Sequence, residues 1–203
     1  MVQGIMESYK TILKEGQAEF KDRGSRFLAI AFPITTPEDF KQKLTHLKKD
    51  HPKANHHCFA YRIGIDGNTF RVSDDGEPSG SAGRPILGQL DSMKITNTGV
   101  VVVRYFGGSL LGVPGLIHAY KTATALALQM CPIVEKPVEV YYQVNCTYND
   151  LNEVMRIVKL CNGSVVSNDQ GLFCTLNISV PRSRIENALT MLGKLYQVEC
   201  KPL

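Results

Sequence analysis

Two glycine-rich segments constrain this chain more than any other feature of its sequence. Residues 74–85 read DDGEPSGSAGRP and residues 104–115 read RYFGGSLLGVPG, and each runs into a helical pattern. Glycine weakens regular structure, so this density predicts that the backbone comes close to another group. A glycine-rich turn that enters a helix leaves N–H groups unpaired at the positive end of the helix dipole, so the two segments together predict one anion-binding site.

The size and net charge of the chain limit the number of its domains and the partners that it can have. The chain has 203 residues, enough for two domains, and a net charge of +4 that by itself neither demands nor excludes a nucleic-acid partner. The longest apolar run, 100–103, is far shorter than the about 20 residues that a membrane helix needs. The N-terminus, MVQGIMESYK, lacks the basic start and apolar core of a signal peptide. We therefore expect a cytoplasmic protein with no membrane partner.

Cysteine spacing points to the same compartment. The six cysteines are scattered without a CxxC pair, which argues against a zinc ribbon and against a secreted domain held by disulfides. We expect reduced, buried thiols. Cys174 has the strand parity of Leu172 and Leu176, which predicts a place on a core face.

The first part of the chain shows an α+β pattern. We expect strands at 9–13, 17–20, 26–34, 57–65, 69–73 and 99–106, and helices that begin at Pro37, at 84–93 and at 115–130. The Asp66-Gly67-Asn68 turn predicts that 57–65 and 69–73 form a hairpin.

After Pro132 and Pro137 the pattern restarts. Strands are expected at 138–146, 164–168, 172–180 and 196–200, with helices at 149–161 and 182–194. This βαββαβ order predicts a ferredoxin-like second domain. We place the boundary near Lys136, which gives domains of 1–135 and 136–203.

Three stretches resemble the signature of the IMPACT/YigZ family: HHCFAYRIG, RVSDDGEPSGSAGRPIL and VVVRYFGGSLLGVPGLIHAYKTA. The trailing βαββαβ unit resembles the small second domain of the bacterial members. The resemblance implies a first domain like domain 2 of ribosomal protein S5, and a second domain like the last domain of elongation factor G.

The resemblance also implies a function. Eukaryotic relatives act in translational control by binding the activator of the starvation-responsive initiation-factor kinase, and bacterial relatives are linked to nucleic-acid or ribosome binding. The family implies no catalytic reaction and no cofactor. Two departures weaken an anion site: Val113-Pro114 stands where small residues are commoner, and His118 stands where the family often has Arg or Lys.

The candidate contact residues fall into two sets. Anion or nucleic-acid contacts are expected from Arg62, Arg71, Arg84, Arg104, Gly107, Gly108, Gly112, Gly115, His118 and His56. The first glycine loop, which has the family pattern, contributes Asp74, Asp75, Gly76, Glu77, Pro78, Ser79, Gly80, Ser81 and Gly83.

Charged side chains at the loops allow two interpretations. Arg104 ends an apolar strand, so its guanidinium binds either an external anion or one of the nearby carboxylates. The acidic cluster 74–77 either holds a magnesium ion that bridges to phosphate or forms a turn that caps the next helix.

Other reactive side chains give weaker evidence of a function. His56 and Cys58 could converge on one face of a strand while His57 points to the other, but no second ligand pair is nearby, so we predict no metal site there. His56 could either contact an anion or simply end the strand. Ser79 and Ser81 lack the GxSxG pattern of a hydrolase, and no catalytic residue is predicted. Tyr105, Phe106 and Tyr120 either stack on bases or anchor the loops in the core.

Two functions follow. The first is a binding protein in translation control that contacts RNA, the ribosome or a translation-associated protein. The alternative is a magnesium-dependent enzyme for a phosphorylated small molecule or nucleotide. A closed pocket at the loops favours the enzyme, and an open basic face favours the binding protein.

Overall fold

The computed structural model describes residues 6–203, except the side chain of Gln170. Contacts between Cα atoms divide the chain into two compact units. One is Tyr9–Lys136, here the first domain, and the other joins Pro137–Leu203 to residues 6–8, here the second domain. Within the described residues, no helix is long and apolar enough to cross a membrane.

The first domain is built on a five-stranded antiparallel sheet in the order β2-β3-β6-β4-β5. A separate two-stranded sheet pairs β1 with β7. The elements are β1 (Ser8–Ile12), β2 (Gly16–Asp22), β3 (Ser25–Pro33), α1 (Pro37–Asp50), β4 (His56–Ile63), β5 (Thr69–Ser73), α2 (Gly83–Met93), β6 (Thr98–Tyr105), α3 (Gly112–Gln129) and β7 (Ile133–Pro137).

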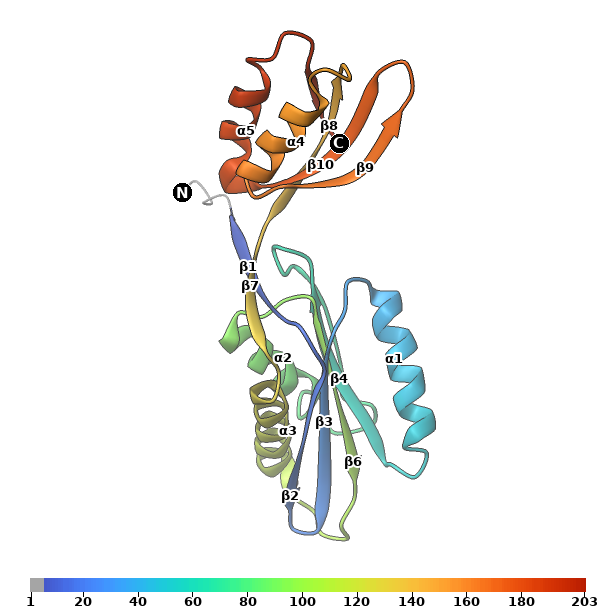
Figure 1. Cartoon of the computed structure of the whole chain (residues 1–203). Helices are drawn as coiled ribbons and strands as arrows, with labels where there is room; N and C mark the ends of the chain where they lie inside the picture. The colour runs from blue at the N-terminus through green and yellow to red at the C-terminus, as the bar shows by residue number, and fades with distance from the viewer. Residues whose placement is uncertain (1–5) are drawn as a thin grey trace. The chain divides into compact units, whose positions relative to one another are not determined.

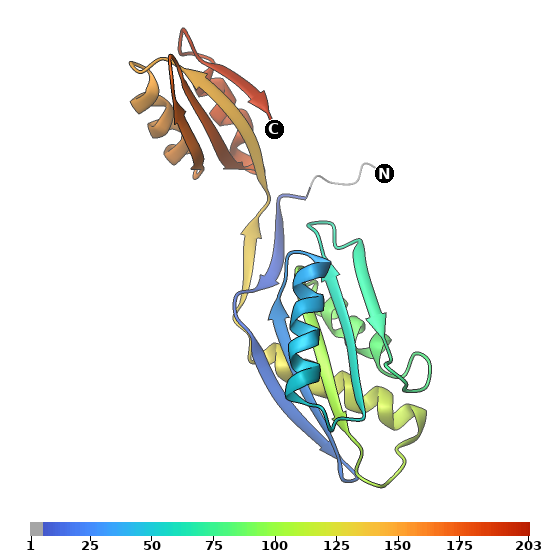
Figure 2. The same ribbon diagram turned by 90° about the vertical axis from the view of Figure 1, so that its right-hand side faces the viewer.

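Helices cover both faces of the large sheet (Figures 1 and 2). The central strand β6 is apolar at every position from 100 to 103, and alternate residues enter different cores. Val100 and Val102 join the core under α2 and α3, whereas Val101 and Val103 join the core under α1. A strand buried on both faces needs a continuous apolar run rather than alternation, which explains the sequence of β6.

Local chemistry sets the start of α1. The Thr36 hydroxyl accepts from the Asp39 N–H, and the Asp39 carboxylate accepts from the Thr36 N–H, so the two residues form a capping box with Pro37 at the first helical position. Hydrogen bonds from Thr35, then from Thr36, lower the pKa of Asp39 to about 2. The helix buries Phe40 and Leu47 in the core on its side of the sheet.

Two details of the first domain differ from the sequence prediction. Helix α3 begins at Gly112 rather than at residue 115, because a proline at position 114 falls in the first turn, where its missing N–H costs no hydrogen bond. Strand β7 was not predicted, since it is short, lies between Pro132 and Pro137, and gains its regularity from pairing with β1 at the other end of the domain sequence.

The second domain has the order predicted for a ferredoxin-like unit, and the α+β fold class is confirmed. Its elements are β8 (Glu139–Cys146), α4 (Leu151–Leu160), β9 (Ser164–Gln170), β10 (Cys174–Pro181), a 3-10 turn (Arg182–Arg184), α5 (Ile185–Leu192) and β11 (Glu199–Pro202). The sheet order is β11-β8-β10-β9, with antiparallel neighbours. The β9–β10 turn lies two residues later than predicted, so Leu172 is exposed in the turn while Cys174 is buried in the core.

Candidate functional site

Strand register brings the two glycine loops to one end of the large sheet. His56 at the start of β4 pairs with Arg104 near the end of β6, and Tyr105 pairs with Arg26 at the start of β3. Strand β5 runs antiparallel to β4 and ends at Ser73, opposite Phe59, so the residues after it continue toward the same end of the sheet. This loop end holds loop 1 (residues 74–82), loop 2 (residues 106–111), the β2–β3 turn and the connection from α1 to β4 (Figure 1).

Asp74 caps helix α2. Its carboxylate accepts backbone N–H bonds from Gly80 at 2.8 Å, Ala82 at 3.0 Å and Gly83 at 2.8 Å. Burial raises the pKa of Asp74, but these bonds lower it by more, and it lies below its ordinary value. Of the two interpretations of the acidic cluster, capping is the one that the structure shows. Within residues 6–203, no three His, Cys, Asp or Glu side chains gather as metal ligands do.

Glu77 and Arg104 form an ion pair in the protein interior. The Arg104 Nη1 donates to Glu77 Oε1 at 2.6 Å, and the Tyr120 hydroxyl donates to the same oxygen at 2.8 Å. The two charged side chains are only 6% and 4% exposed. The guanidinium also lies over the rings of Phe27 and Phe106. Arg104 therefore binds an internal carboxylate from loop 1, and it ties that loop to β6.

Neighbouring groups extend this cluster. The Cys58 thiol lies within hydrogen-bond distance of the Asp74 carbonyl oxygen, 2.9 Å, and of the Tyr120 hydroxyl, 3.2 Å. Burial raises the pKa of both Cys58 and Tyr120. Both groups stay protonated at neutral pH, which makes Cys58 a poor nucleophile. Tyr120 is fully buried and packs edge-on against Phe27, so it anchors the core instead of offering a stacking surface.

Asp75 connects loop 1 to helix α1 and to β4. Its backbone is left-handed, with φ +43°, and its carboxylate accepts the His57 N–H at 2.6 Å and lies 3.6 Å from Lys48 Nζ. Its carbonyl oxygen is 2.8 Å from Nδ1 of His56. Burial lowers the pKa of His57 despite the nearby Asp75 carboxylate. His56 thus packs on loop 1, with its Nε2 3.9 Å from Glu77.

The other loop 1 residues serve the turn itself. The buried Ser81 hydroxyl donates to the Pro78 carbonyl oxygen at 2.6 Å, whereas Ser79 is exposed. Gly76 and Gly80 have positive φ angles. A Cβ at Gly83 would lie 2.8 Å from the backbone nitrogen of Ser73, so this glycine allows α2 to pack on the end of β5.

In loop 2, the close backbone approach predicted from glycine is an approach to the protein's own backbone. A Cβ at Gly107 would lie 1.9 Å from the carbonyl carbon of Gly24, and the Gly107 N–H donates to the Ser25 hydroxyl at 3.1 Å. Gly108 and Gly112 have φ angles of +88° and +71°. No side chain caps the start of α3, so the N–H groups of its first turn, beside Gly115, remain available.

The predicted arginines do not converge on one anion. Arg62 pairs with Asp91 at 2.5 Å and lies opposite Thr98, so it stands about 20 Å along the strands from the loop end. Arg71 lies opposite Tyr61 on the face that carries α1. Arg84, in the first turn of α2, is on the other face and is exposed, and His118 is an exposed residue of α3.

Sequence reasoning missed an apolar component of the loop end. Leu110 is 84% exposed, and Phe106, Val113 and Ile117 are also exposed. Four large, exposed apolar residues on one loop and the following helical turns are unusual for a solvent-exposed surface that has no binding partner. The signal was present in the sequence, since FGGSLLGV places apolar residues among glycines where no core face is expected. We call Arg23, Arg84, residues 106–110, Val113, Ile117 and His118 the loop surface.

Comparison with known proteins identifies the family. Residues 23–128, which include both loops, match the family model of the Impact N-terminal domain. The chain belongs to the IMPACT family. IMPACT family member YigZ of Escherichia coli is 33% identical over 163 residues, which cover 79% of this chain and 80% of YigZ.

Two solved structures are similar to this chain. A crystal structure of a protein described only as hypothetical has a TM-score of 0.77 and 28% identity, and 98% of each chain is covered. A structure of Yih1, described as a two-domain translational regulator, has 33% identity but a TM-score of 0.37, with 60% of this chain and 47% of Yih1 covered. The first likeness supports the fold of the whole chain.

Proposed function

We propose that this chain is a non-enzymatic, cytoplasmic binding protein in translation control, and that its loop surface contacts RNA, the ribosome or a translation-associated protein. The observation that carries the proposal is how the loops use their polar groups. Glu77, Arg104 and the Asp74 carboxylate bind partners inside the protein. The exposed part of the loop end consists mainly of backbone, apolar side chains, the hydroxyl groups of Ser79 and Ser109, and cations, a composition suited to recognition.

The family supplies the cellular process. The chain belongs to the IMPACT family, and the resemblance described above implies translational control for its eukaryotic members. A soluble regulator of translation meets RNA and ribosomes as large, negatively charged partners, which attract exposed cations over a distance.

The charges at the loop end support a macromolecular partner. Arg23 and Arg84 are exposed and form no ion pair within the described part of the chain. An exposed face with unpaired cations fits a nucleic-acid surface better than a small phosphorylated substrate.

Ribosome co-sedimentation across a salt series tests the proposal. We expect association that weakens steeply with salt, because each phosphate contact adds about 0.7–0.9 to the slope of log K against log salt. Reversing both exposed cations, in the variant Arg23→Glu/Arg84→Glu, is expected to reduce that slope by about 1.5 and to weaken association at low salt.

A matched control carries the same change of net charge elsewhere. The variant Lys14→Glu/Lys159→Glu alters two exposed lysines, one in the β1–β2 connection and one in α4. Association that is absent, or that does not change with salt, contradicts the proposal. Equal weakening by both variants shows attraction by net charge alone and also contradicts it.

A further inference from the structure

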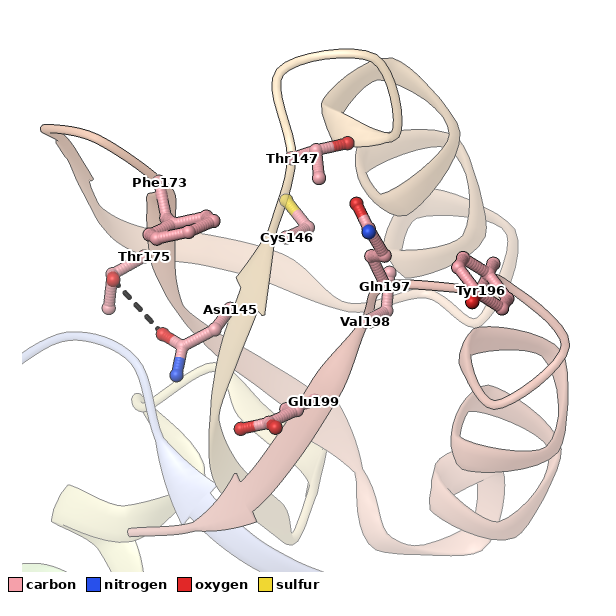
Figure 3. A pocket seen from close by; sticks show the side chains of 9 residues that line it. All are labelled: Asn145, Cys146, Thr147, Phe173, Thr175, Tyr196, Gln197, Val198 and Glu199. Atoms are coloured by element: carbon pink, nitrogen blue, oxygen red, sulfur yellow. Dashed lines mark hydrogen bonds between the residues drawn. The ribbon is translucent and has the colours of Figure 1, made fainter.

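The second domain contains a hollow that the loop surface does not involve. It has a volume of about 740 Å³, and its lining includes Asn145, Phe173, Thr175, Tyr196, Gln197 and Glu199. All of its lining residues belong to the second domain. Figure 3 shows Phe173 and Asn145 on one flank, Gln197 on the other and Glu199 below them.

Strand register builds the polar side of the hollow. Asn145 of β8 lies directly opposite Thr175 of β10 and directly opposite Glu199 of β11. Residues that pair across neighbouring strands share a face of the sheet, so these three side chains form one row. The adjacent pair Cys146 and Cys174 belongs to the core instead. The row therefore lies on the face of the sheet opposite that core.

The side chains of this row can form further hydrogen bonds with a ligand. The Thr175 hydroxyl donates to Asn145 Oδ1 at 3.0 Å, which orients the amide and leaves its NH₂ group for another partner. The Glu199 carboxylate is 73% exposed and has Lys201 at 3.9 Å. A loose, exposed ion pair of this kind contributes little, so Glu199 can exchange it for a better-placed cation.

Two exposed aromatic rings line the same hollow as this carboxylate. Phe173 is 66% exposed and Tyr196 is 96% exposed, although aromatic rings of this size usually bury most of their surface. The face of an aromatic ring attracts cations, and Arg guanidinium groups are its commonest partners in proteins. A hollow lined by both an aromatic ring and a carboxylate offers such a cation two kinds of attractive contact.

The charge of the hollow selects the sign of the ligand. Among its lining residues in the described structure, Glu199 is the only one with a charged side chain. A phosphate-bearing ligand is disfavoured here, because the lining holds a carboxylate and no cation. A planar guanidinium can stack on a ring and donate two parallel hydrogen bonds to a carboxylate, which an ammonium group does less well.

We propose that this hollow binds an arginine side chain presented by a basic peptide segment of a partner protein. The guanidinium donates to Glu199 and stacks on Phe173 or Tyr196, and Asn145 and Gln197 bind the peptide amide groups beside it. The volume exceeds that of one side chain, which is why the ligand is a peptide segment and not a free amine. The proposal does not depend on the loop surface.

Amide NMR spectra of the full-length protein during peptide titration test this. The probes are acetyl-Gly-Arg-Gly-amide, the same peptide with neutral citrulline in place of arginine, and cytidine monophosphate. The arginine peptide is expected to shift signals around the hollow. Glu199→Gln should weaken its binding about tenfold, the loss of one hydrogen-bonded charge contact. Phe173→Ala and Tyr196→Ala should weaken it less.

Matched controls separate the site from general effects. Glu186→Gln removes a different exposed carboxylate, and Leu172→Ala removes an exposed apolar residue next to Phe173 that does not line the hollow. Both should bind the peptide as the wild type does. The variant Arg23→Glu/Arg84→Glu should also bind it, whatever becomes of ribosome association. Equal binding of the citrulline peptide, preference for cytidine monophosphate, or no shifts at the hollow would overturn the proposal.

Discussion

Replacing Arg104 by methionine removes one member of the buried ion pair and leaves the Glu77 carboxylate in the interior with the Tyr120 hydroxyl as its remaining side-chain donor. Methionine is also long and unbranched, so the main change is the loss of the guanidinium charge and of its contacts with the Phe27 and Phe106 rings. Breaking a buried pair by removing one partner costs about 3–5 kcal/mol. With both side chains at most 6% exposed, we expect a loss of about 4 kcal/mol in the free energy of unfolding of the first domain.

Native-state hydrogen exchange of the amides of residues 100–103 is the appropriate assay. These amides lie in the central strand of the first domain and report its opening separately from the second domain. The chain has no tryptophan, so an intrinsic fluorescence signal from that residue is not an option.

Two further variants locate the origin of the loss. Glu77→Gln breaks the same pair from the other side, and the double variant should lose about 2 kcal/mol less than the sum of the single variants, because the members of a pair are coupled. Arg26→Met breaks an exposed pair with Glu19 on the neighbouring strand and should cost far less. If Arg104→Met leaves stability nearly unchanged but abolishes ribosome association, Arg104 is a contact residue and the interior role assigned to it is wrong.

Two other predictions follow from the loops. The pKa of Asp74 is lowered in the folded protein, so its contribution to stability is present above about pH 4 and is lost as the pH falls through the folded-state pKa. Asp74→Asn should therefore cost about 1 kcal/mol in the free energy of unfolding at pH 7, and the difference between this variant and the wild type should shrink in acid unfolding experiments. A difference that grows in acid contradicts the capping role. Gly107→Ala places a Cβ against the Gly24 backbone and should cost about 3 kcal/mol. Gly108→Ala meets open space at a positive φ and should cost about 1–2 kcal/mol in thermal unfolding. Equal losses would contradict the close approach of the two glycine backbones.

Local patterns in the sequence predicted most of the fold. The apolar run of β6, the proline that opens α1, the hairpin turn after β4 and the βαββαβ order of the second domain each depend on residues close together in the chain. Strand β7 was not predicted because it is formed by pairing with β1, which lies more than a hundred residues away in the sequence. The β9–β10 turn was placed too early because Leu172 has core parity in the sequence but lies in the turn.

The candidate site was also predicted in part from local sequence and decided in part by the tertiary structure. The sequence alone determined that both glycine loops follow strands and precede helices, that their motifs are those of the IMPACT family, and that Arg104 must meet either a carboxylate or an anion. Only the tertiary structure decided which of these it meets. Strand register sets Arg104 beside loop 1, and that loop brings the buried Glu77 carboxylate to 2.6 Å from its guanidinium. The packing of Gly107 on Gly24 and the row of Asn145, Thr175 and Glu199 also depend on pairing between distant strands, which no short stretch of sequence specifies.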